Sequence, residues 1–531
     1  MLFSGELKLQ NRMSKFLKWL DDHILEYFSL ALLVFIPLYP KIPLAELLPG
    51  YLVRLRLDDI LIASAFVVWI VWVLRGRVSL RKNPLLIPVG IYILVGFLST
   101  LSAMFITKTV PLETLHVAKL YLHFFRRIEY FSVFFIFFSS IKSLEQIKKY
   151  VYIAAIVLLF VSIYGFGQKY LYWPAYSTMN REFSKGIRLY LTEHARVLST
   201  FGGHYDLAAY LMIMLTLFIP LAFVVKKWLA KILFAAGSLL GFWLLILTVS
   251  RTSFLAYIVS ITVVFLFLVF KKGWFWSIPR WFFVIFFSLA VMVSFGDLAG
   301  RFAHVLKVDK LRNSALLKPL AKNIPSGPQT AYLDVVADKT DVPPSTEKPG
   351  ETGVPADVYG EIGEEGLPAS LSARPRVYSQ AAVQYDLSTG IRLDYTWPQA
   401  IKGFIRNPVL GSGYSTLTKE HVEDFTDAES TDNDFLRALG ETGLGGFLAF
   451  YGILAFTVWY AIKNFKMVKD PFFATIIGGL TAAIIGLLVN AFYIDVFEAS
   501  KVAYIFWIMM AILFAAIRFS KTSPKAKKST R

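Results

Sequence analysis

Apolar runs long enough to cross a lipid bilayer recur along the whole chain, from Ile24 to Ile517. A transmembrane α-helix needs about 20 consecutive apolar residues, because it must span the hydrocarbon layer at a fixed rise per residue. With that length, the sequence predicts an all-α polytopic integral membrane protein with about twelve transmembrane helices. The approximate cores of these spans are residues 24–44, 58–75, 84–105, 121–141, 147–168, 205–225, 230–250, 253–270, 274–295, 435–462, 472–494 and 501–518.

The composition supports a membrane protein and excludes several function classes. Of 531 residues, 56% are hydrophobic and 16% aromatic, and the mean hydropathy is +0.56, which exceeds what a soluble domain carries. The formal net charge of +18 would suggest a nucleic-acid partner in a soluble chain. Here the Lys and Arg residues cluster in short links between apolar runs, as topology signals do, so no nucleic-acid partner is predicted. Zero cysteines exclude disulfides, Cys-ligated metals and thiol nucleophiles.

Basic links alternate along the chain with links that are not basic. The rule that cytoplasmic links carry excess Lys and Arg therefore predicts that both termini are cytoplasmic. Residues 1–23 are then an amphipathic cytoplasmic segment and residues 519–531 a basic cytoplasmic tail. The basic links follow the even-numbered spans: Arg75/Arg77/Arg81/Lys82, Lys142/Lys148/Lys149, Lys226/Lys227/Lys231, Lys271/Lys272, Lys463/Lys466/Lys469 and the tail KTSPKAKKSTR.

The same orientation predicts a large extracytoplasmic loop between helices 9 and 10. Residues 24–295 form helices 1–9, residues 296–434 form the loop, and residues 435–518 form helices 10–12. Within the loop, about 323–374 is rich in Pro, Gly, Asp, Glu and Thr, with few large apolar residues in phase, so we expect a disordered insert there.

Arg251 interrupts the apolar stretch LLILTVSRTSFLAYIVSITVVFLFLVF, and the predicted topology puts it at the outer end of span seven. One interpretation is an arginine that snorkels from a helix end to the interface. The other is a residue that faces a ligand on the outer surface.

Other polar motifs are predicted on the same outer face. In SQAAVQYDLSTGIRLDYTWPQAIKGFIRNPVLGSGYSTL, Arg392 and Trp397 lie on a helix-like stretch that ends at NPVLGSG, where Pro and Gly indicate a tight turn. In STDNDFLRALGETGLGGFLAFYGIL, Asp432 and Asn433 precede span ten and are suited to cap it, with Asp434.

The order of four motifs resembles the O-antigen ligase and polymerase superfamily of bacterial envelope enzymes. They are RVLSTFGGHYDLAAYL, LTVSRTSFLAY, R…W…AIKGFIRNPVLGSGYSTL and DNDFLRALGETGLGGFLAFYGIL, and together they cover roughly residues 190–460. The resemblance implies a metal-independent glycosyltransferase of the bacterial inner membrane that takes a glycan from a polyprenyl-diphosphate carrier on the extracytoplasmic face. Ligases pass the glycan to the lipid A core of lipopolysaccharide or to another acceptor. Polymerases pass it to another lipid-linked repeat unit, and both possibilities stay open.

The resemblance also implies roles for individual residues. Arg251 and Arg392 stand where the family engages the donor's diphosphate, and Arg196 stands where a further arginine recurs. Arginine suits this role because its planar guanidinium binds phosphate oxygens in pairs and stays protonated. The ligase pattern has His-Asn where this chain has Asp432-Asn433. Asp432 is therefore the candidate general base for the acceptor hydroxyl, with an ordinary helix N-cap as the alternative.

The remaining candidates carry weaker signals. Arg126 and Arg127 in HFFRRIEYF either pair internally with Glu129 or border the groove that admits the lipid carrier. Asn433 and Trp397 are candidates for binding the glycan or lipid substrates. No cofactor and no metal site are predicted, because the spacing of His194, His204 and Asp206 matches no strong metal motif.

The alternative function is a transporter or flippase of lipid-linked sugars. Transporters tend to carry polar residues near the bilayer midplane on broken helices, often in paired repeats. In this sequence the conspicuous polar residues gather at one membrane face and no repeat is visible, which favours the enzyme.

Overall fold

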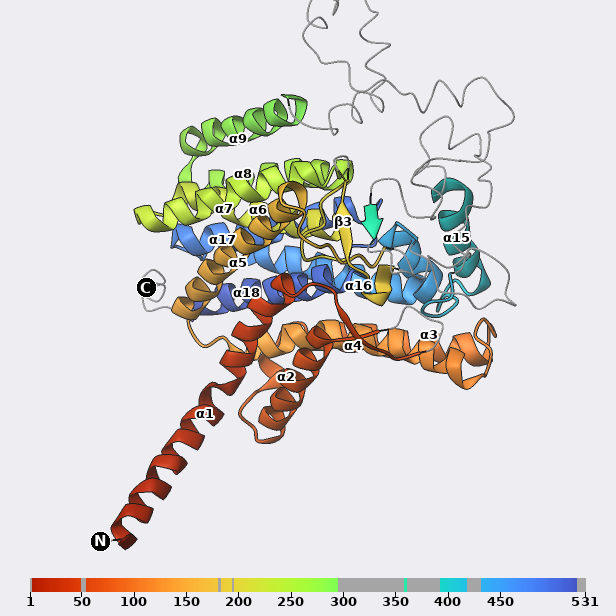
Figure 1. The fold of residues 1–531 in the computed structure, drawn as a ribbon, viewed down its shortest axis with the longest axis horizontal. Coiled ribbons are helices and arrows are strands. Elements are labelled where there is room, and N and C mark those ends of the chain that lie inside the picture. Colours follow the sequence, from red (N-terminus) through yellow and green to blue (C-terminus); the bar gives the residue numbers. More distant parts are fainter. Residues whose placement is uncertain are drawn as a thin grey trace, which may run out of the picture.

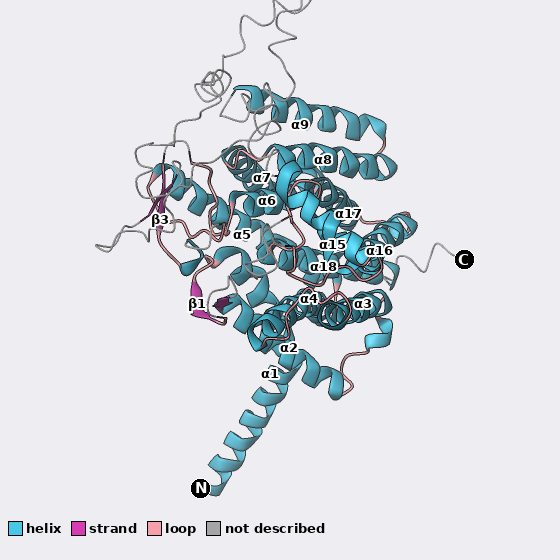
Figure 2. Cartoon of the chain, turned by 90° about the vertical axis from the view of Figure 1, so that its right-hand side faces the viewer, coloured by secondary structure: helices cyan, strands magenta, loops and turns pink. Residues whose placement is uncertain are grey.

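The computed structural model describes residues 2–48, 54–179, 183–192, 195–294, 358–360, 392–417 and 431–522. Helices account for most of this part of the chain (Figures 1 and 2). They are α1 (Leu2–Leu38), α2 (Leu57–Leu74), α3 (Leu86–Phe105), α4 (Thr114–Ser140), α5 (Leu144–Tyr170), α6 (His204–Val224), α7 (Trp228–Leu247), α8 (Arg251–Lys272), α9 (Trp274–Ser294), α15 (Trp397–Arg406), α16 (Asp434–Phe465), α17 (Pro471–Asn490) and α18 (Ser500–Thr522).

Two small antiparallel sheets accompany the helices. β1 (Pro43–Glu46) pairs with β2 (Arg54–Arg56), so that Pro43 lies opposite Arg56. β3 (Leu189–Leu191) pairs with β4 (Val358–Gly360), with Tyr190 opposite Tyr359. β4 lies within the insert predicted to be disordered, and the rest of that insert is outside the described residues.

Ten of the described helices are long and apolar enough to cross a membrane, namely α2, α3, α5 to α9 and α16 to α18. The predicted class, a largely helical polytopic membrane protein, is therefore confirmed, whereas the number twelve is not. The two other predicted cores fall largely in α1 and α4. In α4 the apolar run contains Arg126, Arg127 and Glu129, and in α1 it begins beside Asp22 and includes Glu26.

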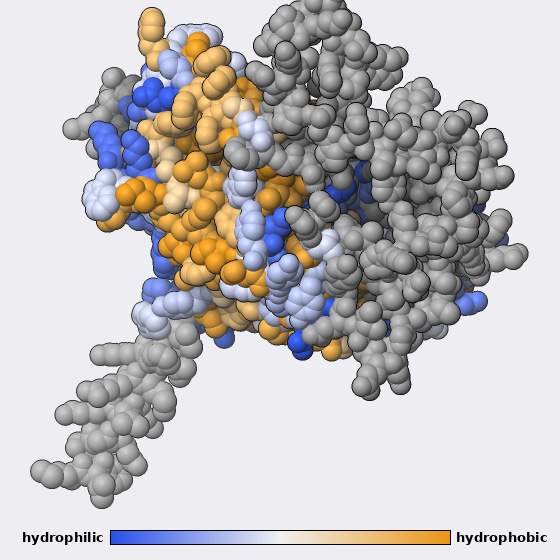
Figure 3. Space-filling model, turned by 45° about the horizontal axis from the view of Figure 1, so that its top comes forward, coloured by the Kyte–Doolittle hydropathy of each residue, from blue (hydrophilic) through white to orange (hydrophobic). Residues whose placement is uncertain are grey.

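The long helices run side by side as a bundle whose centre is formed by α17 and α18. α17 packs against α6, α8, α16 and α18, and α18 packs against α4 and α1. α7 to α9 turn apolar side chains outward, among them Leu239, Leu255 and Phe286. Figure 3 shows the hydrophobic face over this side of the bundle, bordered by hydrophilic residues. A broad exposed apolar face of this kind fits contact with lipid.

Several basic links meet at one end of the bundle. The Lys142 ammonium donates to the Asp22 carbonyl at 3.0 Å, and Arg77 pairs with the Asp22 carboxylate at 3.1 Å. The Lys271 ammonium donates to the Lys466 carbonyl at 3.1 Å. The beginning of α1 and the end of α18 also lie toward this end, on the left in Figure 1. The predicted alternation of links thus corresponds to two chemically different ends of the molecule.

Three features of the helices differ from the predicted spans or add to them. Residues 1–23 were predicted as a segment separate from the first span, but α1 continues from Leu2 to Leu38 as one helix. α16 contains a break at Gly443, whose φ of +63° and ψ of −166° are not helical. The short helix α15 lies crosswise over the end of the bundle opposite to the basic links (Figures 1 and 2).

Candidate functional site

Asp432 occupies a strained turn immediately before α16. Its φ is +50°, in the left-handed region that a non-glycine residue rarely adopts. The N-cap is the next residue, Asn433, whose side-chain oxygen accepts a hydrogen bond from the Leu436 amide at 3.0 Å. The N-cap of α16 is therefore Asn433 and not Asp432.

Arg392 pairs directly with Asp432. One guanidinium nitrogen of Arg392 lies 3.2 Å from the Asp432 carboxylate and donates to the Tyr493 carbonyl, also at 3.2 Å. The guanidinium lies 5.7 Å from the centre of the Tyr493 ring. The Trp397 ring, at the start of α15, lies 6.2 Å from the Tyr493 ring, measured between the ring centres. Arg392 is buried, whereas 35% of the Asp432 side chain is exposed. Two residues predicted from separate motifs are thus brought into contact.

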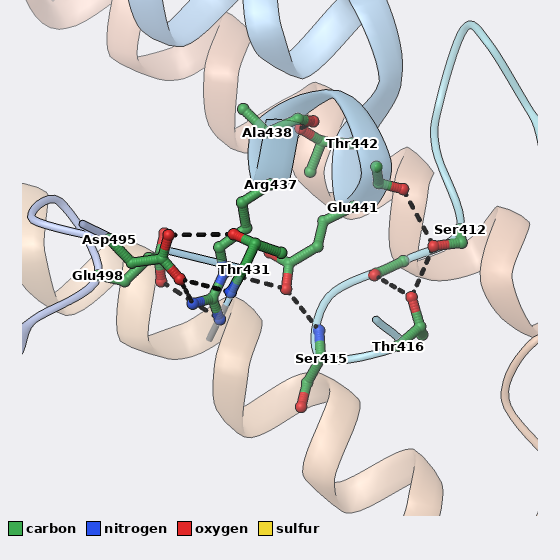
Figure 4. A network of polar contacts seen from close by, with 12 residues as sticks. Ser412, Ser415, Thr416, Thr431, Arg437, Ala438, Glu441, Thr442, Asp495 and Glu498 are labelled. Atoms are coloured by element: carbon green, nitrogen blue, oxygen red, sulfur yellow. Dashed lines mark hydrogen bonds and ion pairs between the residues drawn. The ribbon is translucent and has the colours of Figure 1, made fainter. Parts of the chain in front are cut away.

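Asp495, in the link between α17 and α18, binds the turn that contains Asp432. Its carboxylate accepts hydrogen bonds from the Thr431 amide at 3.0 Å, the Thr431 hydroxyl at 3.0 Å and the Asn433 amide at 2.8 Å. These donors stand on both sides of Asp432. The carboxylate of Asp495 therefore fixes the backbone that presents Asp432. Figure 4 shows Asp495 beside Thr431.

A buried ion-pair network extends from Asp495 through Arg437 of α16. Arg437 pairs with Asp495 at 2.9 Å, with Glu441 at 3.3 Å and with Glu498 at 3.9 Å. Asn433, Arg437 and Glu441 are four residues apart and share one face of the helix. Arg127 of α4 joins the network through Glu498 and, at 3.7 Å, through Glu441. Figure 4 shows the Arg437 side chain with Asp495 and Glu498 on one side and Glu441 on the other.

The turn predicted at NPVLGSG packs against the break in α16. The Asn407 side chain accepts hydrogen bonds from the Val409 and Leu410 amides, which folds the chain back on itself. The Ser412 amide donates to the Gly440 carbonyl at 2.8 Å, and the Ser415 amide donates to the Glu441 carboxylate at 3.0 Å. The turn therefore adds a backbone donor, the Ser415 amide, to the ion-pair network around Arg437.

A cavity of about 940 Å³ lies next to this network. It is lined by the β1–β2 hairpin, the first half of α2, the part of α4 from Lys119 to Ser132 and the beginning of α18, and Arg437 and Glu498 form part of its wall. Its other charged lining residues are the cations Lys41, Arg54, Arg56, Lys119 and Arg126 and the acids Asp59, Glu129 and Asp206. The lining also includes exposed apolar side chains of the two helices, Ile60, Val67 and Phe125.

Arg126 and Arg127 take different positions on α4. Arg126 pairs with Asp59 at 2.5 Å and with Glu129 at 2.9 Å. The internal pairing predicted for Arg126 is thus present, and Arg126 also lines the cavity, whereas a role in admitting a lipid carrier stays a prediction. Arg127 does not line that cavity but lies 5.3 Å from the centre of the Tyr414 ring, next to Glu441 and Glu498.

Arg196 and Arg251 lie at the same end of the bundle without lining the cavity. The Arg196 guanidinium contacts the His204 ring nitrogen at 2.8 Å. The neighbouring Val197 amide donates to the Leu247 carbonyl at 3.2 Å, which ties this segment to the end of α7. Arg251 is the first residue of α8 and is partly exposed, one residue after the N-cap Ser250.

Burial shifts the pKa of Lys41 and of Tyr414, which lie outside the spans. It lowers the pKa of the Lys41 ammonium, while the Asp206 carboxylate at 3.5 Å acts in the opposite direction. Burial also raises the pKa of the Tyr414 hydroxyl. Of the three residues considered for a metal site, Asp206 contacts Lys41 and His204 contacts Arg196. His194 lies outside the described residues.

Sequence reasoning did not assign Arg437, Glu441, Asp495 and Glu498 to the site. A signal for two of them exists in DVFEAS, where Asp495 and Glu498 follow span eleven on the predicted outer face. Paired acids in a short link between apolar helices indicate buried partners or a function. The signal for Arg437 is its position one helical turn after Asn433.

Comparison with known proteins identifies the region that carries much of this site. The search among curated proteins found no match. Residues 236–451 match the model of a protein family described as O-Antigen ligase. The matched region contains Arg251, Arg392, Trp397, Asp432 and Arg437, whereas Arg126, Arg196 and Asp495 lie outside it. Residues 236–451 are therefore similar to the O-antigen ligase family, which confirms the resemblance of this chain to the O-antigen ligase and polymerase superfamily.

Proposed function

We propose that the protein is a membrane glycosyltransferase that moves a glycan from a polyprenyl-diphosphate carrier to an acceptor hydroxyl on the extracytoplasmic face of the bacterial inner membrane. The observation that carries the proposal is the contact between Asp432 and Arg392 inside the region that matches the O-antigen ligase family. An acid and a guanidinium at one point meet two requirements of the reaction, a proton acceptor and a stabiliser of phosphate charge.

The proposed reaction exchanges one bond at the anomeric carbon of the donor glycan. The bond from this carbon to the diphosphate oxygen breaks, and its electron pair stays on the diphosphate. A new bond forms to the acceptor oxygen, and the hydroxyl proton passes to the Asp432 carboxylate. Negative charge grows on the leaving diphosphate, where preorganised cationic donors stabilise it most effectively.

The ion pair suggests how the two parts of the reaction are coupled. When Asp432 takes up the proton it loses its charge, and its attraction for Arg392 weakens. The guanidinium then interacts more strongly with the departing diphosphate. In this proposal Arg251, at the start of α8, contributes a second cation from the same end of the bundle, and Asn433 and Trp397 contact the substrates.

The cavity between α2 and α4 supports a lipid-linked substrate. Its exposed apolar side chains, Ile60, Val67 and Phe125, suit a hydrocarbon tail, and its cations, including Arg56 and Arg126, suit a phosphate group. The wall shared with Arg437 joins it to the network that holds Asp432. We therefore propose that the lipid carrier approaches Asp432 from this side.

The proposal leaves the acceptor open between a ligase and a polymerase. Analysis of glycans in cells that lack the protein separates the two. Loss of long chains indicates a polymerase, whereas chains of normal length that remain on the carrier indicate a ligase. A transporter gains no specific support from the fold or from the family match.

The decisive experiment measures glycan transfer by purified protein with a polyprenyl-diphosphate donor. We expect Asp432→Asn to lower the rate by about 100-fold or more, since general base catalysis contributes on that order. The matched control is Glu145→Gln, which removes an exposed carboxylate at the end with the basic links. Unchanged transfer by Asp432→Asn would exclude Asp432 as the base. Translocation of the lipid-linked glycan by the wild type without any transfer would instead support the transporter.

A further inference from the structure

α15 presents an apolar stripe and a basic stripe side by side on its exposed surface. Ile401 is 46% exposed and Ile405, one turn later, is 68% exposed. Lys402 and Arg406 follow each of them and are also exposed. Residues four apart share one face of a helix, so the two isoleucines form one stripe and the two cations form the stripe beside it. This pattern is typical of helices that lie in the plane of a membrane interface.

The opposite face of α15 is packed firmly against α16, which fixes the direction of the exposed stripes. Ala400 and Gly403 are buried. A Cβ atom on Gly403 would lie 2.9 Å from the Gly440 carbonyl oxygen, and one on Gly440 would lie 2.7 Å from the Ala400 carbonyl oxygen. Backbones this close leave no room for α15 to rotate about its axis. Ile401 and Ile405 therefore cannot turn inward.

The apolar stripe continues into the surface of a membrane-spanning helix. Val409 follows α15, is 64% exposed, and its carbonyl accepts a hydrogen bond from the Gly445 amide at 3.0 Å. Leu444 and Leu448, on either side of this point in α16, are exposed as well. α16 is one of the helices long and apolar enough to cross a membrane, so these leucines face lipid.

The outer end of α3 borders the same surface. The Asn407 side chain donates to the Ser102 hydroxyl at 3.0 Å, which joins the end of α15 to α3. Phe105 and Ile106 at the end of α3 are exposed. The patch on α15 is therefore continuous with apolar side chains of two spans, and α15 itself runs crosswise to them (Figure 2).

We infer that α15 is an in-plane helix docked on the outer leaflet, with Ile401, Ile405 and Val409 at the acyl boundary and Lys402 and Arg406 against anionic lipid phosphates. Long basic side chains at this depth keep their charge in the headgroup region while their stems cover apolar surface. α15 begins directly after the π-helical segment Arg392–Thr396, so the bilayer surface sets the depth of Arg392. The inference does not depend on the proposed glycan transfer.

The chain contains no cysteine, so single-cysteine variants allow a direct measurement of depth. The variants Ile405→Cys and Lys402→Cys each carry an environment-sensitive fluorophore in full-length protein, reconstituted in phosphatidylcholine vesicles with phosphatidylglycerol. Leu448→Cys is the control in lipid, and Glu113→Cys, whose side chain is 74% exposed before α4, is the control in water. Quenching is measured with lipids that carry spin labels at shallow or deep positions.

We expect quenching at 405 within about twofold of that at 448 and at least about fivefold above that at 113, as for a helix buried to the acyl boundary. The label at 402 should report a shallower depth than the label at 405. Quenching at 405 no greater than at 113 would overturn the inference. So would a water-shielded label at 405 that lipid quenchers do not reach, since a second copy or another segment of the chain would then cover the stripe.

Discussion

At the scale of single residues, the position of the Asp432 carboxylate is set by two distant parts of the chain and by the neighbouring residue Asn433. Arg392 approaches it from the large loop, Asn433 relieves it of capping α16, and Asp495 holds the peptide groups on both sides. The positive φ of Asp432 costs of order 1–3 kcal/mol, which the surrounding hydrogen bonds must offset. Strain held in this way is found at functional sites, because it presents a side chain that a relaxed turn would direct elsewhere.

Arg392→Lys and Arg251→Lys test whether the arginines bind a diphosphate through two nitrogens. Lysine keeps the charge but loses the planar fork, and charge-assisted hydrogen bonds are worth about 1.5–3 kcal/mol, so each variant should lose at least about tenfold in transfer rate. The measurement is glycan transfer at equal amounts of folded protein. Arg75→Lys, at an exposed pair with Asp21, is the control and should be silent. Wild-type rates in both site variants would return Arg251 to the role of an interface anchor.

Asp495→Asn tests a positioning role. The substitution replaces one carboxylate oxygen by an NH2 group, which then faces another donor, the Thr431 amide or the Arg437 guanidinium. The buried Arg437 cation also loses the negative charge of its partner. We expect a fall in kcat with little change in KM, together with a lower melting temperature. Thr431→Val removes the hydroxyl that lies within hydrogen-bond distance of the Asp495 carboxylate and the Asn433 carbonyl, and it should cost about 1 kcal/mol in stability. A kcat that stays at the wild-type value in folded Asp495→Asn would show that the turn does not need this carboxylate.

The sequence predicts some of these residues and not others for a physical reason. Arg392, Asp432 and Asn433 belong to local motifs with a recognisable turn or helix start. Asp495 and Glu498 act through Arg437, and this contact exists only because the link after α17 returns to the beginning of α16. A tertiary contact of that kind leaves no periodic pattern in one sequence.

At the scale of elements, the site depends on the fit between the NPVLGSG turn and the broken part of α16. The Leu444 amide donates to the Pro408 carbonyl at 2.8 Å, so backbone groups released by the break find partners in the turn. Gly411 has a φ of +69° and Gly443 a φ of +63°. Glycine adopts this region without the steric penalty that a Cβ atom brings, so the two elements require glycine at both points.

Gly443→Ala should separate the turn from α16. Its Cβ atom would lie 2.4 Å from the Val409 carbonyl carbon in a conformation that alanine avoids. We expect a clear drop in melting temperature in detergent and loss of transfer. Gly452→Ala, in the same helix with nothing within 4 Å of the added atom, should be neutral or slightly stabilising. Equal melting temperatures for the two alanine variants would mean that the break in α16 is not required.

The elements themselves were largely predictable, because span length and apolar content are set by bilayer thickness. The prediction of membrane spans was less reliable where charged residues lie inside an apolar run. α4 carries Arg126, Arg127 and Glu129 in its apolar run, and these charges are tolerated because Asp59, Tyr504 and Glu498 contact them inside the protein. α15 was predicted only as a helix-like stretch, since its direction across the bundle follows from its packing on Gly440.

At the scale of the whole molecule, the two ends of the bundle differ in charge and in content. One end gathers basic links, where Lys142, Arg77 and Lys271 contact backbone carbonyls or acids of neighbouring links. The other end carries the Arg392–Asp432 pair, the cavity and α15. A reaction on a lipid-linked glycan needs all of its groups on one side of the membrane, and this separation of the two ends meets that condition.

The topology is testable with two exposed positions at opposite ends, since the chain offers no native thiol. Lys466→Cys lies in the basic link after α16, and Glu113→Cys lies before α4 at the other end. Excess Lys and Arg keep a short link in the cytoplasm, so a thiol reagent that cannot cross membranes should label Glu113→Cys in intact inner-membrane spheroplasts and Lys466→Cys only after permeabilisation. Both variants should label equally in detergent, which controls for reactivity. Labelling of Lys466→Cys in intact spheroplasts would show that the orientation is the reverse of the predicted one. Asp432 would then face the cytoplasm, away from glycans displayed on the outer leaflet.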